Sequence, residues 1–387
     1  MKSPSHLGHF TSRVNRLYNE DKYSANVLSL PDDKTVFNFN IFDGHGGDQC
    51  STYLSNNLSQ GIEDATTLLN DAASRDKLIE TYWKNIGGYW KRWYKHRNEN
   101  FEVMKALSTT EDLITLPDAS DDLHLRLPLA FLNTDYNFFL QDDNQSGSTC
   151  TSALIQTVHS EPGAFQPVYE NYFFNRKTIS KLTIAHVGDT SAILVDRDGK
   201  AHTLTQSHHP SNPSEASRLR KYAANFFMTD SFGEERFIAL ANTRAFGDIN
   251  FKQMGVTAEP EVTEYIIGDA QTIQQELSPE QIKTHTVGGM GGDESFLILV
   301  TDGVTDVLTD QEIADIVMVH FNLKGHDIAS PQMGAEEVIK FVEYVGGSDN
   351  ATCLIIRLNG WGKWPVIDRT GELRQERLND FNPRGRN

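Results

Sequence analysis

The sequence has little cysteine and no long apolar run. Its 387 residues include only three cysteines, Cys50, Cys150 and Cys353, which are too few and too scattered for a disulfide framework or a zinc ligand set. The longest uninterrupted apolar stretch, Phe296 to Val300, covers five residues, whereas a membrane-spanning helix needs about 20. We therefore expect no transmembrane segment.

Positive charge is also scarce. The chain has 35 Lys and Arg against 53 Asp and Glu, a formal net charge of −18. An acidic surface repels phosphate backbones, so nucleic acid is excluded as the main partner. The N-terminus lacks the apolar core of a secretory signal. We therefore expect an intracellular protein, either cytoplasmic or mitochondrial.

Short apolar strands alternate along the chain with helical segments. In 36–42, apolar Phe37, Phe39 and Ile41 alternate with two asparagines, the period of a half-buried strand. Several short strands joined by tight turns favour antiparallel sheets, and the interleaved helices favour a layered sandwich with helices outside. Further strands are expected at 151–157, 182–187, 191–195, 296–300 and 352–358, and helices at about 48–60, 66–97, 129–141, 212–224, 310–321 and 332–345.

Two segments look like additions to this pattern. Residues 62–128 have a helical pattern with Ile79 and Trp83 on one face, followed by a polar loop near 108–128. The opposite face is basic, and it is either a docking surface for an acidic partner or, as we favour, a solvated helix face; it comprises Lys84, Lys91, Arg92, Lys95 and Arg97. The second addition is the polar C-terminal tail, 359–387.

Acidic residues stand at the ends of several expected strands. Asp43 directly follows the 36–42 strand, Asp302 follows 296–300, and Asp349 precedes 352–358. Each single Asp-Gly pair is typical of a plain turn, but converging strand ends can bring several carboxylates together. A carboxylate cluster without cysteine suits hard cations such as Mg²⁺ or Mn²⁺.

At these residues the chain resembles the PP2C-type metal-dependent Ser/Thr protein phosphatases, the PPM family. The matching motifs occur in the family's order and cover residues 10–358 apart from the 62–128 insertion. They are Arg16-Leu17-Tyr18-Asn19-Glu20-Asp21, Phe42-Asp43-Gly44-His45-Gly46-Gly47, Ser146-Gly147-Ser148-Thr149, His186-Val187-Gly188-Asp189-Thr190, His208-His209-Pro210-Ser211-Asn212-Pro213, Arg244-Ala245-Phe246-Gly247-Asp248, Thr301-Asp302-Gly303-Val304-Thr305-Asp306 and Ser348-Asp349-Asn350.

The resemblance implies an α+β fold, a four-layer α-β-β-α sandwich of two antiparallel sheets flanked by helices. It also implies two Mg²⁺ or Mn²⁺ ions at one edge. By position, Asp43 would bridge both ions, the Gly44 carbonyl would bind one of them, and Asp302 and Asp349 would complete the other. The remaining implied roles are those of Glu20 and Asp21, which would act mainly through ion-bound waters, and Arg16, which would hold the substrate phosphate.

The implied reaction is hydrolysis of phosphoserine or phosphothreonine in proteins, without a covalent intermediate. Two cations can generate hydroxide at neutral pH and neutralise the phosphoryl oxygens. His45 would protonate the leaving alkoxide, or else only orient the groups around it. Some relatives bind a third ion through an Asp at the position of Asn144; Asp143 could replace it only with a one-residue shift of register, so we expect two ions.

Other residues have weaker roles in this interpretation. Asp189 and Asp248, each after a glycine, are expected to hydrogen-bond the backbone of their turns, with direct binding of an ion as the less favoured alternative. His208 and His209 are expected to be structural. Residues 221–243 correspond to the family's flap beside the site.

The rival function is a catalytically inactive binding protein of the same fold, which would lack one of the main site residues. We expect a monomer that acts on phosphoproteins with basic residues near the phosphate.

Overall fold

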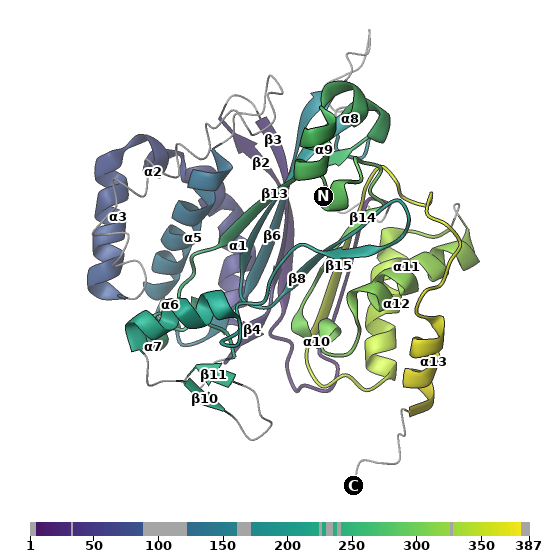
Figure 1. Ribbon diagram of the computed structural model, residues 1–387. Coiled ribbons are helices and arrows are strands. Elements are labelled where there is room, and N and C mark those ends of the chain that lie inside the picture. The colour runs from purple at the N-terminus through teal and green to yellow at the C-terminus, as the bar shows by residue number, and fades with distance from the viewer. Residues whose placement is uncertain are drawn as a thin grey trace.

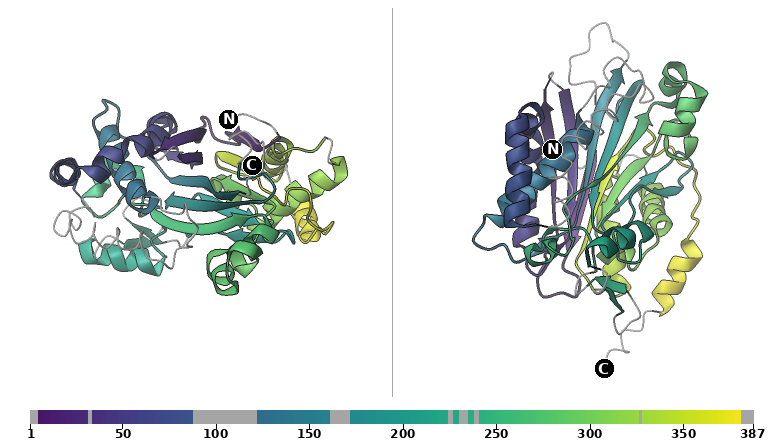
Figure 2. Two further views of the ribbon diagram at one scale, coloured as in Figure 1. Left: turned by 90° about the horizontal axis from the view of Figure 1, so that it is seen from above. Right: turned by 60° about the vertical axis from the view of Figure 1, so that its left-hand side comes forward.

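The computed structural model describes residues 5–31, 34–87, 122–160, 172–223, 227–229, 235–237, 241–325 and 328–380. Two five-stranded sheets pack face to face between layers of helices (Figures 1 and 2). Every strand pair in both sheets is antiparallel. The predicted α+β four-layer sandwich is confirmed.

The two sheets place their apolar faces against each other. The first has the order β13-β7-β6-β3-β2 and the second β1-β15-β14-β8-β9. In β3, Phe37, Phe39 and Ile41 point into the core between the sheets, where they meet Leu297 and Leu354 of the second sheet. The strands are β1 (Leu7–Ser12), β2 (Lys22–Leu30), β3 (Lys34–Phe42), β6 (Cys150–Ser160), β7 (Thr178–Val187), β8 (Ser191–Val195), β9 (Ala201–Thr203), β13 (Glu261–Gly268), β14 (Phe296–Val300) and β15 (Ala351–Arg357).

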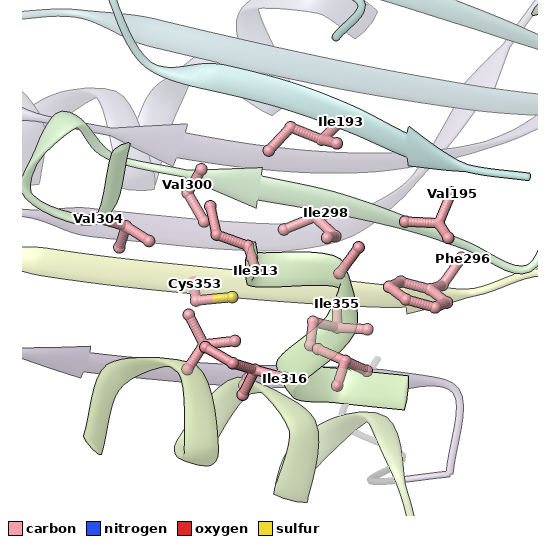
Figure 3. Close-up of a cluster of buried hydrophobic side chains, with 14 of the residues drawn as sticks. Ile193, Val195, Phe296, Ile298, Val300, Val304, Ile313, Ile316, Cys353 and Ile355 are labelled. Atoms are coloured by element: carbon pink, nitrogen blue, oxygen red, sulfur yellow. The ribbon is translucent and has the colours of Figure 1, made fainter. Parts of the chain in front are cut away.

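Helices cover the outer face of each sheet. Helices α1 (Gln49–Asp64) and α5 (Leu123–Phe139) bury the first sheet, while α11 (Asp310–Lys324) and α12 (Pro331–Tyr344) bury the second. Figure 3 shows the second of these cores, in which Ile313 and Ile316 of α11 lie over Ile298 and Ile355. Within the described ranges, no helix has the length and apolarity needed to cross a membrane.

Small elements connect the layers. A three-stranded sheet of β4 (Gly44–His45), β5 (Gly147–Ser148) and β12 (Phe246–Gly247) joins three motif segments at one edge of the sandwich. The others are β10 (Phe227–Thr229), β11 (Glu235–Phe237), α6 (Pro213–Ala223), α7 (Ile249–Lys252), α8 (Ala270–Glu276), α9 (Pro279–His285), the 3-10 turn η2 (Val287–Gly289) and α10 (Asp302–Thr305).

The helical stretch expected over about 66–97 is helical from 66 to 85, but it is divided into two helices at Asp71. Helix α2 (Thr66–Asn70) ends before Asp71, whose carboxylate accepts hydrogen bonds from the next backbone amides and starts α3 (Ala72–Asn85). Ile79 is buried as the helical spacing indicated. Residues 88–121, with most of the expected basic face, lie outside the described residues.

The C-terminal tail packs onto the second helical layer. Trp361 and Trp364 are buried against Phe296 and Phe321. The tail then forms α13 (Gly371–Asp380), where Arg377 pairs with Glu312 of α11 at 2.7 Å. Up to residue 380 the segment is therefore part of the sandwich.

Candidate metal centre

Three carboxylates converge where strands from both sheets end. Asp43 follows β3, Asp189 follows β7, and Asp302 follows β14 at the start of α10. One carboxylate oxygen from each lies within 4.8 Å of the other two. The group sits at the end of the sandwich marked in Figure 1 by β4 and α10.

The pKa values of all three carboxyl groups are raised, and burial is the largest cause for each. Burial, followed by the charges of Asp302, Asp21 and Asp189, raises the pKa of Asp43 well above its usual range. Burial and then the charge of Asp189 raise the pKa of Asp302 to about 8. The pKa of Asp189 is raised by burial as well, despite a hydrogen bond from Asn242. Such crowding is unfavourable without a counter-charge, because like charges disfavour ionisation.

Asp21 lies beneath this group. Its Oδ2 accepts hydrogen bonds from the Thr301 and Thr352 hydroxyls at 2.9 and 2.7 Å, and burial raises its pKa to about 6. Its Oδ1 is buried with no hydrogen-bond partner among the described residues. The Glu20 carboxylate instead accepts the Gly47 amide at 2.6 Å.

Arg16 and Asp349 meet at the rim of the centre. An Nη2 of Arg16 lies 2.5 Å from Oδ2 of Asp349, and both side chains are partly exposed. The charge of Asp349 also contributes to the raised pKa of Asp302 and of Asp21. The structure therefore brings Asp349 to the edge of the acidic group and an arginine beside it.

His45 is held by a carboxylate from a distant segment. Its Nε2 lies 2.8 Å from Oδ2 of Asp248. Burial lowers the pKa of His45, but the bond to Asp248 and the charges of Asp248, Asp189 and Glu20 outweigh it, so the pKa is raised overall. A Cβ on Gly147 would lie 2.3 Å from that Nε2, so only glycine leaves room for the pair.

One turn residue differs from expectation: Asp248, expected to hydrogen-bond the backbone, binds the imidazole of His45. Asp189 accepts a backbone hydrogen bond, as expected, but it also contributes to the acidic group, which fits the less favoured alternative of an ion ligand. Its Oδ1 is buried without a hydrogen-bond partner in the described part of the chain. A glycine-aspartate pair after a strand is ambiguous in sequence; only the convergence of the strand ends separates the two cases.

His208 is structural, as predicted, and supports Asp189 indirectly. Its Nδ1 accepts the Gly188 amide at 3.0 Å, and its own amide donates to the Gly188 carbonyl at 2.8 Å. Its Nε2 lies 3.2 Å from a carboxylate oxygen of Glu261. This reciprocal pair fixes the turn that carries Asp189.

The residues considered for a third ion do not join the group. The Asn144 side-chain amide donates to the Phe139 carbonyl at 2.6 Å, and Asp143 is exposed. Nearly half of the expected flap, 221–243, lies outside the described residues, and β10 and β11 pair as antiparallel strands within it.

The donor set fits hard divalent cations. Carboxylate oxygens from Asp43, Asp189 and Asp302 face one another, and Asp21 offers a buried oxygen without a partner among the described residues. A Cβ on Gly44 would lie 2.5 Å from the Glu20 carbonyl, so the backbone here approaches closely. Oxygen ligands without sulfur or imidazole suit Mg²⁺ or Mn²⁺.

Comparison with known proteins supports the resemblance. The family described as Protein phosphatase 2C matches residues 66–273 and 279–351. The chain belongs to the protein phosphatase 2C family. This is a family of protein serine/threonine phosphatases, as the motifs implied.

Individual relatives support this family assignment, and a solved structure supports the fold. Protein phosphatase 2C homolog 4 of Schizosaccharomyces pombe is 33% identical over 99% of this chain and 88% of its own length. Protein phosphatase 1K, mitochondrial, of Xenopus laevis is 32% identical over 93% and 69%. A Toxoplasma gondii phosphatase structure matches with a TM-score of 0.56 and 18% identity over 92% of this chain and 94% of its own. At that identity the structure supports the fold.

Proposed function

We propose that this chain hydrolyses phosphoserine and phosphothreonine in proteins with two Mg²⁺ or Mn²⁺ ions and without a covalent enzyme intermediate. The observation that carries the proposal is the convergence of the Asp43, Asp189 and Asp302 carboxylates, with Arg16 and His45 at its border. A phosphatase of this family needs anionic ligands and a phosphate-binding cation side by side.

The ligands would come from both sheets. Asp43 would bind both ions, the Gly44 carbonyl would bind one of them, and Asp302 and Asp349 would bind the other. Asp189 is a further candidate ligand, because one of its carboxylate oxygens lies close to those of Asp43 and Asp302. Glu20 and Asp21 would bind waters around the ions. When bound, two divalent ions supply hydroxide at neutral pH and neutralise the phosphoryl oxygens.

The chain's own groups would bind phosphate and move a proton. Arg16 can release Asp349 to the ions and turn its planar guanidinium to two phosphate oxygens. With Nε2 of His45 engaged by Asp248, Nδ1 would be the ring nitrogen that protonates the leaving alkoxide. The raised pKa of His45 favours the protonated imidazole that this step requires.

The negative charge of the protein restricts which phosphoproteins it should bind. A net charge of −18 should repel highly acidic phosphoproteins, so we propose substrates with basic residues near the phosphate. We propose a monomer for the enzyme. We propose the cytoplasm or the mitochondrion as the compartment; two relatives carry "mitochondrial" in their names.

The test is hydrolysis of a phosphopeptide and of p-nitrophenyl phosphate with Mn²⁺ and with EDTA. Both activities should require metal, and Asp43→Asn should nearly abolish them. Asp142→Asn, which removes one exposed charge outside the centre, is the matched control and should retain activity. Full activity in EDTA would refute the metal mechanism, and no activity with metal would favour an inactive binding protein.

A further inference from the structure

Two large apolar side chains project into solvent directly after Arg16. Leu17 is 84% exposed and Tyr18 is 79% exposed. Single exposed apolar residues are ordinary on protein surfaces, but two adjacent ones beside a candidate phosphate ligand are a reason to ask what covers them.

The loop that presents them is fixed at several points. The side-chain amide of Asn350 donates to the carbonyls of Arg13 and Tyr18 at 3.2 and 2.9 Å. The Arg16 amide donates to the Arg13 carbonyl, and the Arg13 guanidinium donates back to the Arg16 carbonyl at 2.7 Å. The Asn15 side chain is tied to a carbonyl of the segment before β15 at 2.6 Å. The two apolar side chains are therefore held outward by an ordered backbone.

The same anchors join this loop to the centre. Asn350 follows Asp349, and its Oδ1 accepts the Glu20 amide at 2.8 Å. Arg16 reaches Asp349 from the loop at 2.5 Å. A phosphate bound by Arg16 would therefore be held by the residue that directly precedes Leu17 and Tyr18 in the same anchored loop.

We propose that Leu17 and Tyr18 form a subsite for an apolar residue that flanks the phosphorylated serine or threonine of a protein substrate. The proposal rests on the proposed function, in which Arg16 binds the phosphate. Its occupant is one class of ligand, an extended phosphopeptide segment with a Leu, Ile, Met or Phe near the phosphorylated residue.

Chain geometry gives the position of that residue. An extended peptide advances roughly 3.3–3.6 Å per residue, and its side chains alternate between two faces. When the phosphorylated side chain points into the centre, the residues two positions before and after it point to the same face, roughly 7 Å away. Leu17 and Tyr18 directly follow Arg16 in the anchored loop, so a residue at this spacing is the one we expect to contact them.

The subsite should act through apolar contact rather than charge. Covering part of one apolar side chain on an open surface should raise kcat/KM about fivefold. Because the loop is already ordered, little entropy is lost when the peptide covers it. The preference should persist at high salt, which would weaken contacts between exposed charges.

The experiment compares phosphoserine peptides that differ only in Leu or Ser at the positions two residues before and two residues after the phosphorylated residue. The Mn²⁺-loaded wild type should prefer a Leu peptide about fivefold in kcat/KM. The double variant Leu17→Ser/Tyr18→Ser should lose that ratio, and Leu17→Met/Tyr18→Phe should keep it. Leu323→Ser, which removes a 79% exposed leucine from α11, is the matched control and should keep the ratio.

Several results would overturn the subsite. Equal rates for Leu and Ser peptides in the wild type, or an unchanged ratio in the double Ser variant, would each refute it. A double Ser variant that changes the oligomeric mass in light scattering, with the ratio intact, would make the patch an interface between copies instead. Wild-type hydrolysis of p-nitrophenyl phosphate separates these failures from failure of the proposed function, because that substrate has no flanking residues.

Discussion

Raising the pH should destabilise the metal-free protein, because its acidic centre holds protons that the unfolded chain would release. The pKa of Asp302 is raised to about 8 from an ordinary 3.8, first by burial and then by the charge of Asp189. Between those values the folded state binds more protons than the unfolded chain, so stability is greatest on the acid side and falls as pH rises. Asp21, with a pKa raised to about 6, adds to the loss at the lower end.

The size of the effect follows from the shift. One extra bound proton corresponds to about 1.4 kcal/mol per pH unit, so Asp302 alone should cost about 2–3 kcal/mol between about pH 5.5 and pH 7.5. For a chain of 387 residues this lowers the melting temperature by about 3 °C, at roughly 2 cal/mol/K of unfolding entropy per residue.

The assay is thermal unfolding across this pH range in EDTA and in excess Mn²⁺. The ions should remove most of the fall, because they replace protons as the counter-charge. Buried Glu294, whose pKa is raised to about 7, should contribute equally under both conditions, so the difference between the two curves isolates the centre. Asp302→Asn should flatten the EDTA curve, while Asp142→Asn should not. A metal-free wild type whose stability stays level or rises over this range would refute the reasoning.

Three further changes probe the scaffold around the centre. Tyr82→Phe removes a hydroxyl that donates to the buried Asp135 carboxylate at 2.6 Å. It should lower the free energy of unfolding in urea by about 1–3 kcal/mol, and an unchanged free energy would mean that the bond has no net value. Glu215→Gln leaves two arginines without their buried carboxylate and should cost about 3–5 kcal/mol, measured in the same way, whereas a neutral effect would contradict the burial argument. Gly303→Ala places a Cβ 1.9 Å from the Asn350 carbonyl oxygen and should abolish phosphatase activity in the Mn²⁺ assay, which normal turnover would disprove.

The fold was predictable where side-chain periodicity and strand length agree. In β3, Phe37 and Phe39 alternate with asparagines, and the strand lies where the pattern placed it. The break between α2 and α3 was missed, because helical spacing continues across Asp71 while its capping depends on local backbone geometry. Helix α13 was missed for another reason. It is polar, and its contact with the domain includes the long-range pair of Arg377 with Glu312.

The centre was predictable in part. Asp43 and Asp302 were placed by strand ends and motif order, and the structure brings them together. Asp189 was considered as an ion ligand only as the less favoured alternative, because its Gly-Asp sequence is typical of an ordinary turn. The partner of His45 was also missed, since Asp248 is 203 residues away and only the pairing of β4, β5 and β12 brings the two together.

The excess of acid in this chain has two different consequences. Over the surface, a net charge of −18 repels anions and should weaken binding of acidic partners. At the centre, Asp43, Asp189 and Asp302 are buried close together, and the pKa of each is raised, so the fold holds carboxylates that favour a proton or a cation. Protons and metal ions would compete for the same oxygens: a proton neutralises one carboxylate, whereas divalent ions would reverse the local charge. Under the proposed function, the charge of the ions and of Arg16 would outweigh these carboxylates and allow an acidic protein to bind phosphate there.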